Sequence, residues 1–187
     1  MTPTATLSDG EALAAVLGAS DDLFFRRGVA AVSMAEVRDA SGVSLRRLYS
    51  LFPAKTDLVT CWLTHRHTVW MRSFEAEFRA HVAAGIQPVD AVFDAIADWL
   101  VSTEFRGCGF INTWAETGER TAQHEAVIRD HKAALRTLLA TIADDGSEGC
   151  ALAVIVDGAI VQAAIFESTD PIDAARRAAH ALTSGGS

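Results

Sequence analysis

The segment from Ser33 to Phe52, SMAEVRDASGVSLRRLYSLF, constrains the fold of this chain more than any other. Ser33 and Glu36 have the spacing of a capping box, so a helix is predicted to begin at Ser33. Gly42 can adopt the positive φ that ends a helix sharply, and Ser44 can cap a second helix. The pattern predicts two short helices joined by a tight turn, which is helix-turn-helix geometry.

The second predicted helix has two different faces. Its large apolar side chains lie close to one face, whereas Arg46 and Arg47 point away from that face. Pro53 ends the helix, because the residue before a proline is pushed out of helical geometry, and the next helix is predicted to begin near Lys55. The two arginines are therefore predicted to be available for contact with another molecule.

The charge distribution favours a polyanion as that molecule. Residues 26–55 contain six basic and two acidic side chains, a net charge of +4, in a chain whose net charge is −8. The remainder therefore carries −12. A basic island on an acidic body restricts the approach of phosphates to one surface.

These residues lie in a longer stretch, residues 23–59, that resembles the tetracycline-repressor (TetR) family of bacterial transcriptional regulators. The resemblance rests on an apolar pair and a glycine at the end of the first helix, a serine that opens the second, a Gly-Val-Ser turn, a tyrosine, a Phe-Pro-x-Lys sequence and an acidic-Leu pair. The residues concerned are Leu23, Phe24, Gly28, Ser33, Gly42, Val43, Ser44, Tyr49, Phe52, Pro53, Lys55, Asp57 and Leu58.

The resemblance implies two sets of DNA contacts. One set binds phosphates, and it comprises Ser33, Ser44, Tyr49 and Lys55. The other set faces base edges, where an arginine can bind guanine in bidentate fashion, and it comprises Leu45, Arg46 and Arg47. The chain departs from the pattern at Leu51, where many members carry a phosphate-binding histidine, and in lacking basic residues before the first helix.

Helical periodicity continues through the rest of the chain, with no strand pattern and no repeat. The predicted fold class is all-α, with about nine helices. A three-helix head is expected at residues 1–54 and a six-helix body for ligand binding and dimerisation at residues 55–187, a layout that also resembles the TetR family. Body helices are predicted at 55–84, 88–100, 105–116, 120–143 (closed by Asp145-Gly146), 150–166 and 171–184.

The helix predicted at 150–166 is apolar nearly all round, which indicates burial on more than one side. We expect a partner subunit to cover its second side, so that a homodimer forms through the helices 150–166 and 171–184. Seventeen residues that include Asp157 and Gln162 are too short and polar for a membrane span. Two heads on a twofold axis would read a palindromic operator.

Several body residues allow two interpretations, core packing or the wall of an effector cavity. Aromatic residues at helical spacing are typical of a core, whereas the TetR resemblance favours a cavity for a fairly apolar small molecule. The candidate ligand-binding residues are Trp70, Phe74, Trp99, Phe110, Asn112, Trp114 and His131. His124 and His131 share a helical face with apolar residues and are expected to point inward, either as satisfied core histidines or toward a ligand.

Neither a metal site nor a cofactor is predicted, because the histidines and cysteines lack ligand spacing. Cys108 is expected near a helix start, where a redox or covalent role is one alternative. On a helix it would share a face with Asn112 and Glu116, which either orient a ligand or form a solvated edge. Asp157 either binds a cation or is a capped group at an interface.

No nucleophile elbow, phosphate-binding loop, dinucleotide fingerprint or zinc-protease motif is present, so the chain is not expected to be an enzyme. No signal-peptide pattern is visible, and a cytoplasmic location is expected. The predicted function is a ligand-responsive regulator, a repressor that an effector releases from DNA. An activator and a helical-bundle protein-interaction module without sequence-specific DNA binding remain alternatives.

Overall fold

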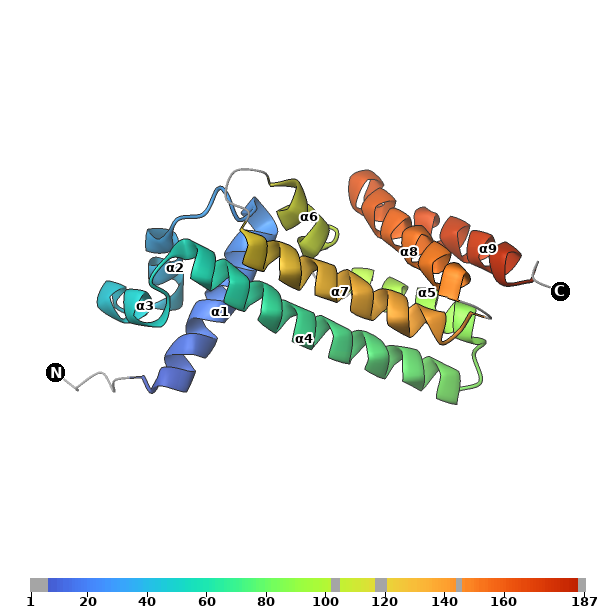
Figure 1. The fold of residues 1–187 in the computed structure, drawn as a ribbon, viewed down its shortest axis with the longest axis horizontal. Coiled ribbons are helices and arrows are strands. Elements are labelled where there is room, and N and C mark those ends of the chain that lie inside the picture. Colours follow the sequence, from blue (N-terminus) through green and yellow to red (C-terminus); the bar gives the residue numbers. More distant parts are fainter. Residues whose placement is uncertain (1–6, 102–104, 117–120, 144–145, 185–187) are drawn as a thin grey trace. The chain divides into compact units, whose positions relative to one another are not determined.

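The structure is a computed structural model of the 187-residue chain, and it describes residues 7–101, 105–116, 121–143 and 146–184. The described residues form nine α-helices and no strand, so the predicted all-α fold class is confirmed (Figure 1). The helices are α1 (Asp9–Arg27), α2 (Met34–Ser41), α3 (Leu45–Leu51), α4 (Lys55–Ala83), α5 (Pro88–Val101), α6 (Gly109–Ala115), α7 (Ala122–Ala140), α8 (Gly146–Phe166) and α9 (Asp170–Ser184).

The chain divides into two compact units. The head unit comprises Met1–Arg66 and Asn112–Val127, and the body unit comprises His67–Ile111 and Ile128–Ser187. Helices α4, α6 and α7 each supply residues to both units. The domain boundary predicted between residues 54 and 55 stays a prediction.

Local capping sets the helix ends of the head unit, as the sequence predicts. Ser8 and Ser33 each form a complete capping box at the start of α1 and α2. Gly42 follows α2 with φ 70°, in the left-handed region, and its amide donates to the Arg38 carbonyl. Ser44 caps α3, because its hydroxyl oxygen accepts the Arg47 amide at 3.2 Å.

Two body helices differ from their predicted limits. The helix expected at 105–116 begins only at Gly109, since Gly107 adopts φ 85° and interrupts a helical path. The helix expected to begin at Cys150 begins at Gly146, so Gly146 opens a helix instead of closing one. Apolar periodicity marks the buried part of a helix, and polar or glycine-rich first turns fall outside that signal.

The head unit has its own core. Phe24 of α1 meets Trp62 of α4 edge to face, with ring centroids 5.2 Å apart. The Trp62 indole donates to the Asp21 carboxylate at 2.8 Å, which satisfies its one polar group. Val37 and Leu48 bring α2 and α3 onto the same core, and both are fully buried. The packing thereby fixes which face of α3 points outward.

In the body unit, α8 and α5 both pack against α9. The inner side of α8 is buried, whereas Val154, Ile165 and Phe166 on its other side are 69, 65 and 67% exposed. A single chain therefore covers only one apolar side of this helix, and the expected burial of its second side by a partner subunit stays a prediction. By length and composition, Glu148–Phe166 would also suffice to cross a membrane, a test that core helices of soluble proteins pass too.

Candidate nucleic-acid interface

The outward face of α3 is the surface that the helix-turn-helix prediction singles out. Leu48 anchors α3 to the head core. Leu45 and Tyr49, which are one turn apart and flank the arginines in sequence, are 42 and 46% exposed. Arg46 is also exposed and makes no hydrogen bond or ion pair within the described part of the chain. The Ser44 hydroxyl accepts from the α3 backbone and lies on the exposed side. The face thus offers a cation and hydroxyl groups to a partner.

Most other basic side chains of the head unit are already paired with carboxylates. Arg47 pairs with Asp9, the residue that opens α1. The remaining pairs are Arg26 with Asp22, Arg27 with Glu36 at 2.8 Å, Arg38 with Asp39 at 2.5 Å, and Arg66 with Asp21 at 2.5 Å. Asp9 and Asp22 precede residues 26–55, so a count over that stretch overstates its positive charge. Four of the six basic residues of the island are thus neutralised by carboxylates, Arg46 has no partner among the described residues, and Lys55 is half-buried with contacts of its own.

Ser33 is held differently from the other predicted phosphate contacts. Its hydroxyl and its backbone amide both donate to the Glu36 carboxylate, at 2.7 and 2.8 Å. These backbone and side-chain hydrogen bonds, with Arg27 nearby, lower the pKa of Glu36 to about 2. The carboxylate stays ionised, and a phosphate contact at Ser33 requires the hydroxyl to turn away from Glu36.

The lowered pKa of Glu36 makes the stability of α2 depend on pH. A carboxyl with a depressed folded-state pKa contributes stability above its unfolded pKa, about 4.3, and loses it as the pH falls toward the folded value. We expect the free energy of unfolding of the wild type and of Glu36→Gln, measured by urea denaturation, to converge between about pH 5 and about pH 2.5. A difference that stays constant over this range would contradict the prediction.

Glu116 binds the turn between α1 and α2. Helix α6 ends at Ala115, and the next residue, Glu116, accepts the Val29 amide at 3.1 Å and the Ala30 amide at 2.5 Å. The Glu116 amide still donates to the Asn112 carbonyl, one turn earlier, while its carboxylate is the acceptor that two backbone donors of the turn need. Gly28 faces the same carboxylate: a Cβ there would lie 2.9 Å from Glu116 Oε1.

Gly28→Ala is expected to destabilise the protein. Gly28 has φ 83° and ψ 154°, a conformation that is strained for any residue with a side chain and costs about 1–3 kcal/mol. The new methyl would also displace Glu116 from its two amide donors. Urea unfolding followed by circular dichroism measures the loss. Gly10→Ala is the matched control, because Gly10 lies in α1 and has nothing packed within 4 Å of the place that an added Cβ would occupy. This variant should be more stable than the wild type, since alanine has the higher helix propensity. Equal effects at the two glycines would contradict the prediction.

The body unit brings most of the predicted ligand-binding rings together. Trp70 stacks on Phe74 at 4.9 Å and meets Trp99 and His131 edge to face, at 5.7 and 5.2 Å. Phe110 stacks on His131 with centroids 3.7 Å apart. These five residues, the aromatic cluster, pack against one another, so the structure has the arrangement expected of a core.

The two predicted inward-pointing histidines are both buried. His124 accepts the Thr121 amide at Nδ1, so its Nε2 donates to the Thr56 carbonyl at 2.9 Å, as a satisfied core histidine would. His131 Nδ1 lies 3.2 Å from Nδ1 of His67, which is half-buried. A neutral pair at this distance shares one proton, one ring donating and the other accepting.

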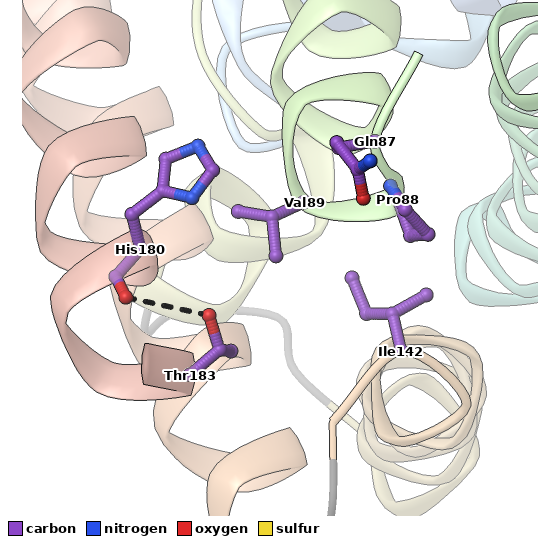
Figure 2. A pocket seen from close by; sticks show the side chains of 6 residues that line it. All are labelled: Gln87, Pro88, Val89, Ile142, His180 and Thr183. Atoms are coloured by element: carbon purple, nitrogen blue, oxygen red, sulfur yellow. Dashed lines mark hydrogen bonds between the residues drawn. The ribbon is translucent and has the colours of Figure 1, made fainter. Parts of the chain in front are cut away.

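Asn112 and Trp114 are not part of the aromatic cluster. Both belong to the head unit, and both are exposed, Trp114 by 38%. A pocket of about 300 Å³ in the body unit has none of the predicted ligand-binding residues in its lining (Figure 2). It opens where α5 begins, beside the second residue after α7 and the last turns of α9, and it is lined by Gln87, Pro88, Val89, Ile142, His180 and Thr183. Sequence periodicity does not indicate this pocket, since its lining comes from helix ends.

Cys108 precedes α6 and is buried. The Lys132 ammonium donates to its sulfur at 3.6 Å and pairs with the Asp157 carboxylate at 2.6 Å. Asp157, for which the sequence allowed either a cation ligand or a capped group at an interface, thus forms an ion pair with Lys132 of α7. The same pairing holds the lysine beside the thiol.

Comparison with known proteins agrees with these observations. Residues 16–60 match the family model described as bacterial regulatory proteins of the tetR family. No curated protein sequence matches the chain. Among solved structures, a TetR-family transcriptional regulator from Streptomyces coelicolor is similar with a TM-score of 0.79 and 22% identity, over 94% of this chain and 96% of that one.

Two further structures show the same fold. Escherichia coli NemR in its reduced form is similar with a TM-score of 0.78 and 15% identity, over 90% of this chain and 95% of that one. The regulatory protein TetR from Rhodobacter sphaeroides has a TM-score of 0.78 and 18% identity, over 91% and 98%. The chain thus carries a segment, residues 16–60, that matches the tetR family model, and it has the all-helical fold of TetR-family transcriptional regulators.

Proposed function

We propose that this protein is a homodimeric, ligand-responsive repressor that binds a palindromic operator and leaves it when a small molecule binds the body unit. The outward face of α3 carries the proposal. Arg46 is exposed there without a partner among the described residues, between the exposed side chains of Leu45 and Tyr49. An arginine presented on a short exposed helix can reach the base edges of a major groove. Ser44, Tyr49, Arg47 and Lys55 would contact the flanking backbone and bases.

The exposed side of α8 supports a dimer. Val154, Ile165 and Phe166 leave apolar surface in water, and Gly158 on the same helix is exposed with nothing within 4 Å of a Cβ. Contiguous exposed apolar surface typically marks an interaction site, and a glycine on it permits close approach of a second helix. A second copy of the chain would cover this side of α8, with α9 packed behind it.

The aromatic cluster supports an apolar effector. Its rings offer flat apolar walls, and buried His131 adds one polar group, a composition common in small-molecule sites. Because the rings touch one another, an effector would have to separate them. We assign the half-buried rings of Trp70 and Trp99 as those that move, and their fluorescence would report the binding of a candidate effector.

The direct test is enrichment of a random pool of duplex DNA on the full-length protein, followed by gel shifts with the enriched sequences. A palindromic consensus bound by the wild type, and lost on Arg46→Ala, is the expected result. The absence of any enriched sequence at every salt concentration would favour the protein-interaction module. Expression of the controlled gene in a deletion strain then separates repression, where transcript rises, from activation, where it falls.

A further inference from the structure

Three metal-ligating side chains meet on the body unit, apart from the aromatic cluster and from the pocket in Figure 2. Glu77 and His81 belong to α4, and Asp98 belongs to α5. One ligand atom of each lies within 4.8 Å of those of the other two. His81 Nε2 and Asp98 Oδ2 are 2.9 Å apart. We infer that these three residues form a binding site for a divalent transition-metal ion of the zinc class.

The spacing fits a single ion. Two ligand atoms that are each about 2.1 Å from one zinc ion stand roughly 3.0–3.4 Å apart, at angles between 90° and tetrahedral. The distance between His81 Nε2 and Asp98 Oδ2 already matches the lower limit. Glu77 precedes His81 by four residues and so shares its helical face. The exposed Glu77 side chain can close the remaining gap by rotation.

The donor set selects the class of metal. Magnesium and calcium prefer sites built only from oxygen atoms, whereas an imidazole nitrogen suits zinc, copper and nickel. Two carboxylates with a neutral imidazole carry a charge of −2, which a divalent cation balances. Three protein ligands leave coordination positions for water. The exposure of Glu77 and Asp98 gives an ion and its waters access.

The helix carrying two of the ligands adds to the attraction. His81 stands in the last turn of α4, which ends at Ala83. The aligned peptide dipoles of a helix give its C-terminal end a partial negative charge, which favours a cation. A bound ion would join α4 to α5 across the His81–Asp98 contact, and by mass action it would stabilise the folded chain.

A histidine–aspartate ion pair without metal is the competing explanation, and the body unit contains a matched example. His180 Nε2 lies 2.8 Å from Asp90 Oδ1, but the third neighbour is the Arg176 guanidinium, 3.3 Å from the same carboxylate oxygen. A cation in that position repels a metal ion. The two histidine–aspartate pairs are therefore matched within 0.1 Å in their N–O distance, at 2.9 and 2.8 Å, but the third side chain is a carboxylate in one and a guanidinium in the other.

The test is the binding of Zn²⁺ to the untagged, full-length protein after treatment with a chelator. Titration against a chromophoric zinc indicator should give one ion per chain. His81→Ala and Glu77→Gln should each weaken binding by at least about tenfold, whereas His180→Ala should bind as the wild type does. Zn²⁺ should also raise the melting temperature of the wild type and of His180→Ala but not that of His81→Ala.

Glu77→Gln keeps the test decisive if His81→Ala fails to fold, since Glu77 is exposed. Cobalt(II) provides a second readout, and its spectrum should lack the thiolate charge-transfer band that ligation by one of the three cysteines would produce. Absence of zinc binding, zinc affinity unchanged in both variants, or a thiolate band would each overturn the inference. None of these outcomes bears on DNA binding, so the proposed function is tested separately.

Discussion

Replacement of Arg46 by alanine is expected to weaken binding to the enriched operator by about 1–3 kcal/mol per head, roughly five- to 150-fold. Arg46 is exposed on α3 and is not paired with a carboxylate among the described residues. No ion pair therefore has to break before its guanidinium binds a base edge. The loss should be specific, because a base contact discriminates between sequences and a phosphate contact does not. Affinity for unrelated duplex DNA should fall much less.

Replacement of Arg47 by alanine should reduce operator affinity less than replacement of Arg46 does, because DNA binding has to break the ion pair between Arg47 and Asp9. Asp9→Asn removes that competition and one negative charge near the DNA, so this variant should bind more tightly than the wild type. Quantitative gel shifts at fixed salt measure all three variants. Arg79→Ala is the control, an exposed arginine of α4 that pairs with Glu75. Equal binding by Arg46→Ala and the wild type would contradict the assignment of Arg46.

Val154→Glu is expected to convert the proposed dimer to a monomer. Val154 is 69% exposed on the apolar side of α8, so glutamate there is harmless to the single chain. In a dimer, the new carboxylate would be buried without a partner, which costs several kcal/mol. Binding to a palindrome should then fall steeply, because two linked heads are needed to engage both half-sites.

Sedimentation velocity gives the oligomeric state of the variant directly. Val101→Glu is the matched control, since Val101 is an even more exposed valine, at 79%, and lies at the end of α5. The control should remain a dimer with wild-type operator affinity. A Val154→Glu protein that sediments as a dimer would exclude the exposed side of α8 as the interface.

The head helices are predictable from sequence because their ends depend on neighbouring residues. Ser33 with Glu36, Gly42 and Ser44 each act within four positions along the chain, and the structure confirms all of these caps. The body helices are harder, because their polar first turns lack the apolar periodicity of the packed part. Gly146 opens α8 four residues before the apolar run begins.

The arrangement of the candidate site depends on contacts between distant residues. Arg47 and Asp9 are 38 positions apart, and Glu116 is 86 positions from Ala30. No local pattern indicates such pairs, so a count of charges along residues 26–55 cannot show which are neutralised. Aromatic spacing likewise identifies rings that face inward, but it cannot say whether Trp70 and Trp99 touch each other or a ligand.

The paired arginines of the head also bear on how this protein responds to ionic strength. A basic residue that binds a DNA phosphate normally displaces one of the cations condensed on the DNA. Each displaced cation makes the slope of log affinity against log salt concentration more negative by about 0.9. An arginine that leaves Asp9 or Glu36 exposes a carboxylate that gathers a cation from solution, which offsets the one released. The twelve basic residues that two copies of residues 26–55 contain would give a slope of about −11 if all bound DNA and none were paired beforehand. For this protein the slope of log affinity against log salt concentration should be much shallower. Its DNA binding should therefore persist at salt concentrations that dissociate a regulator whose DNA contacts are unpaired arginines.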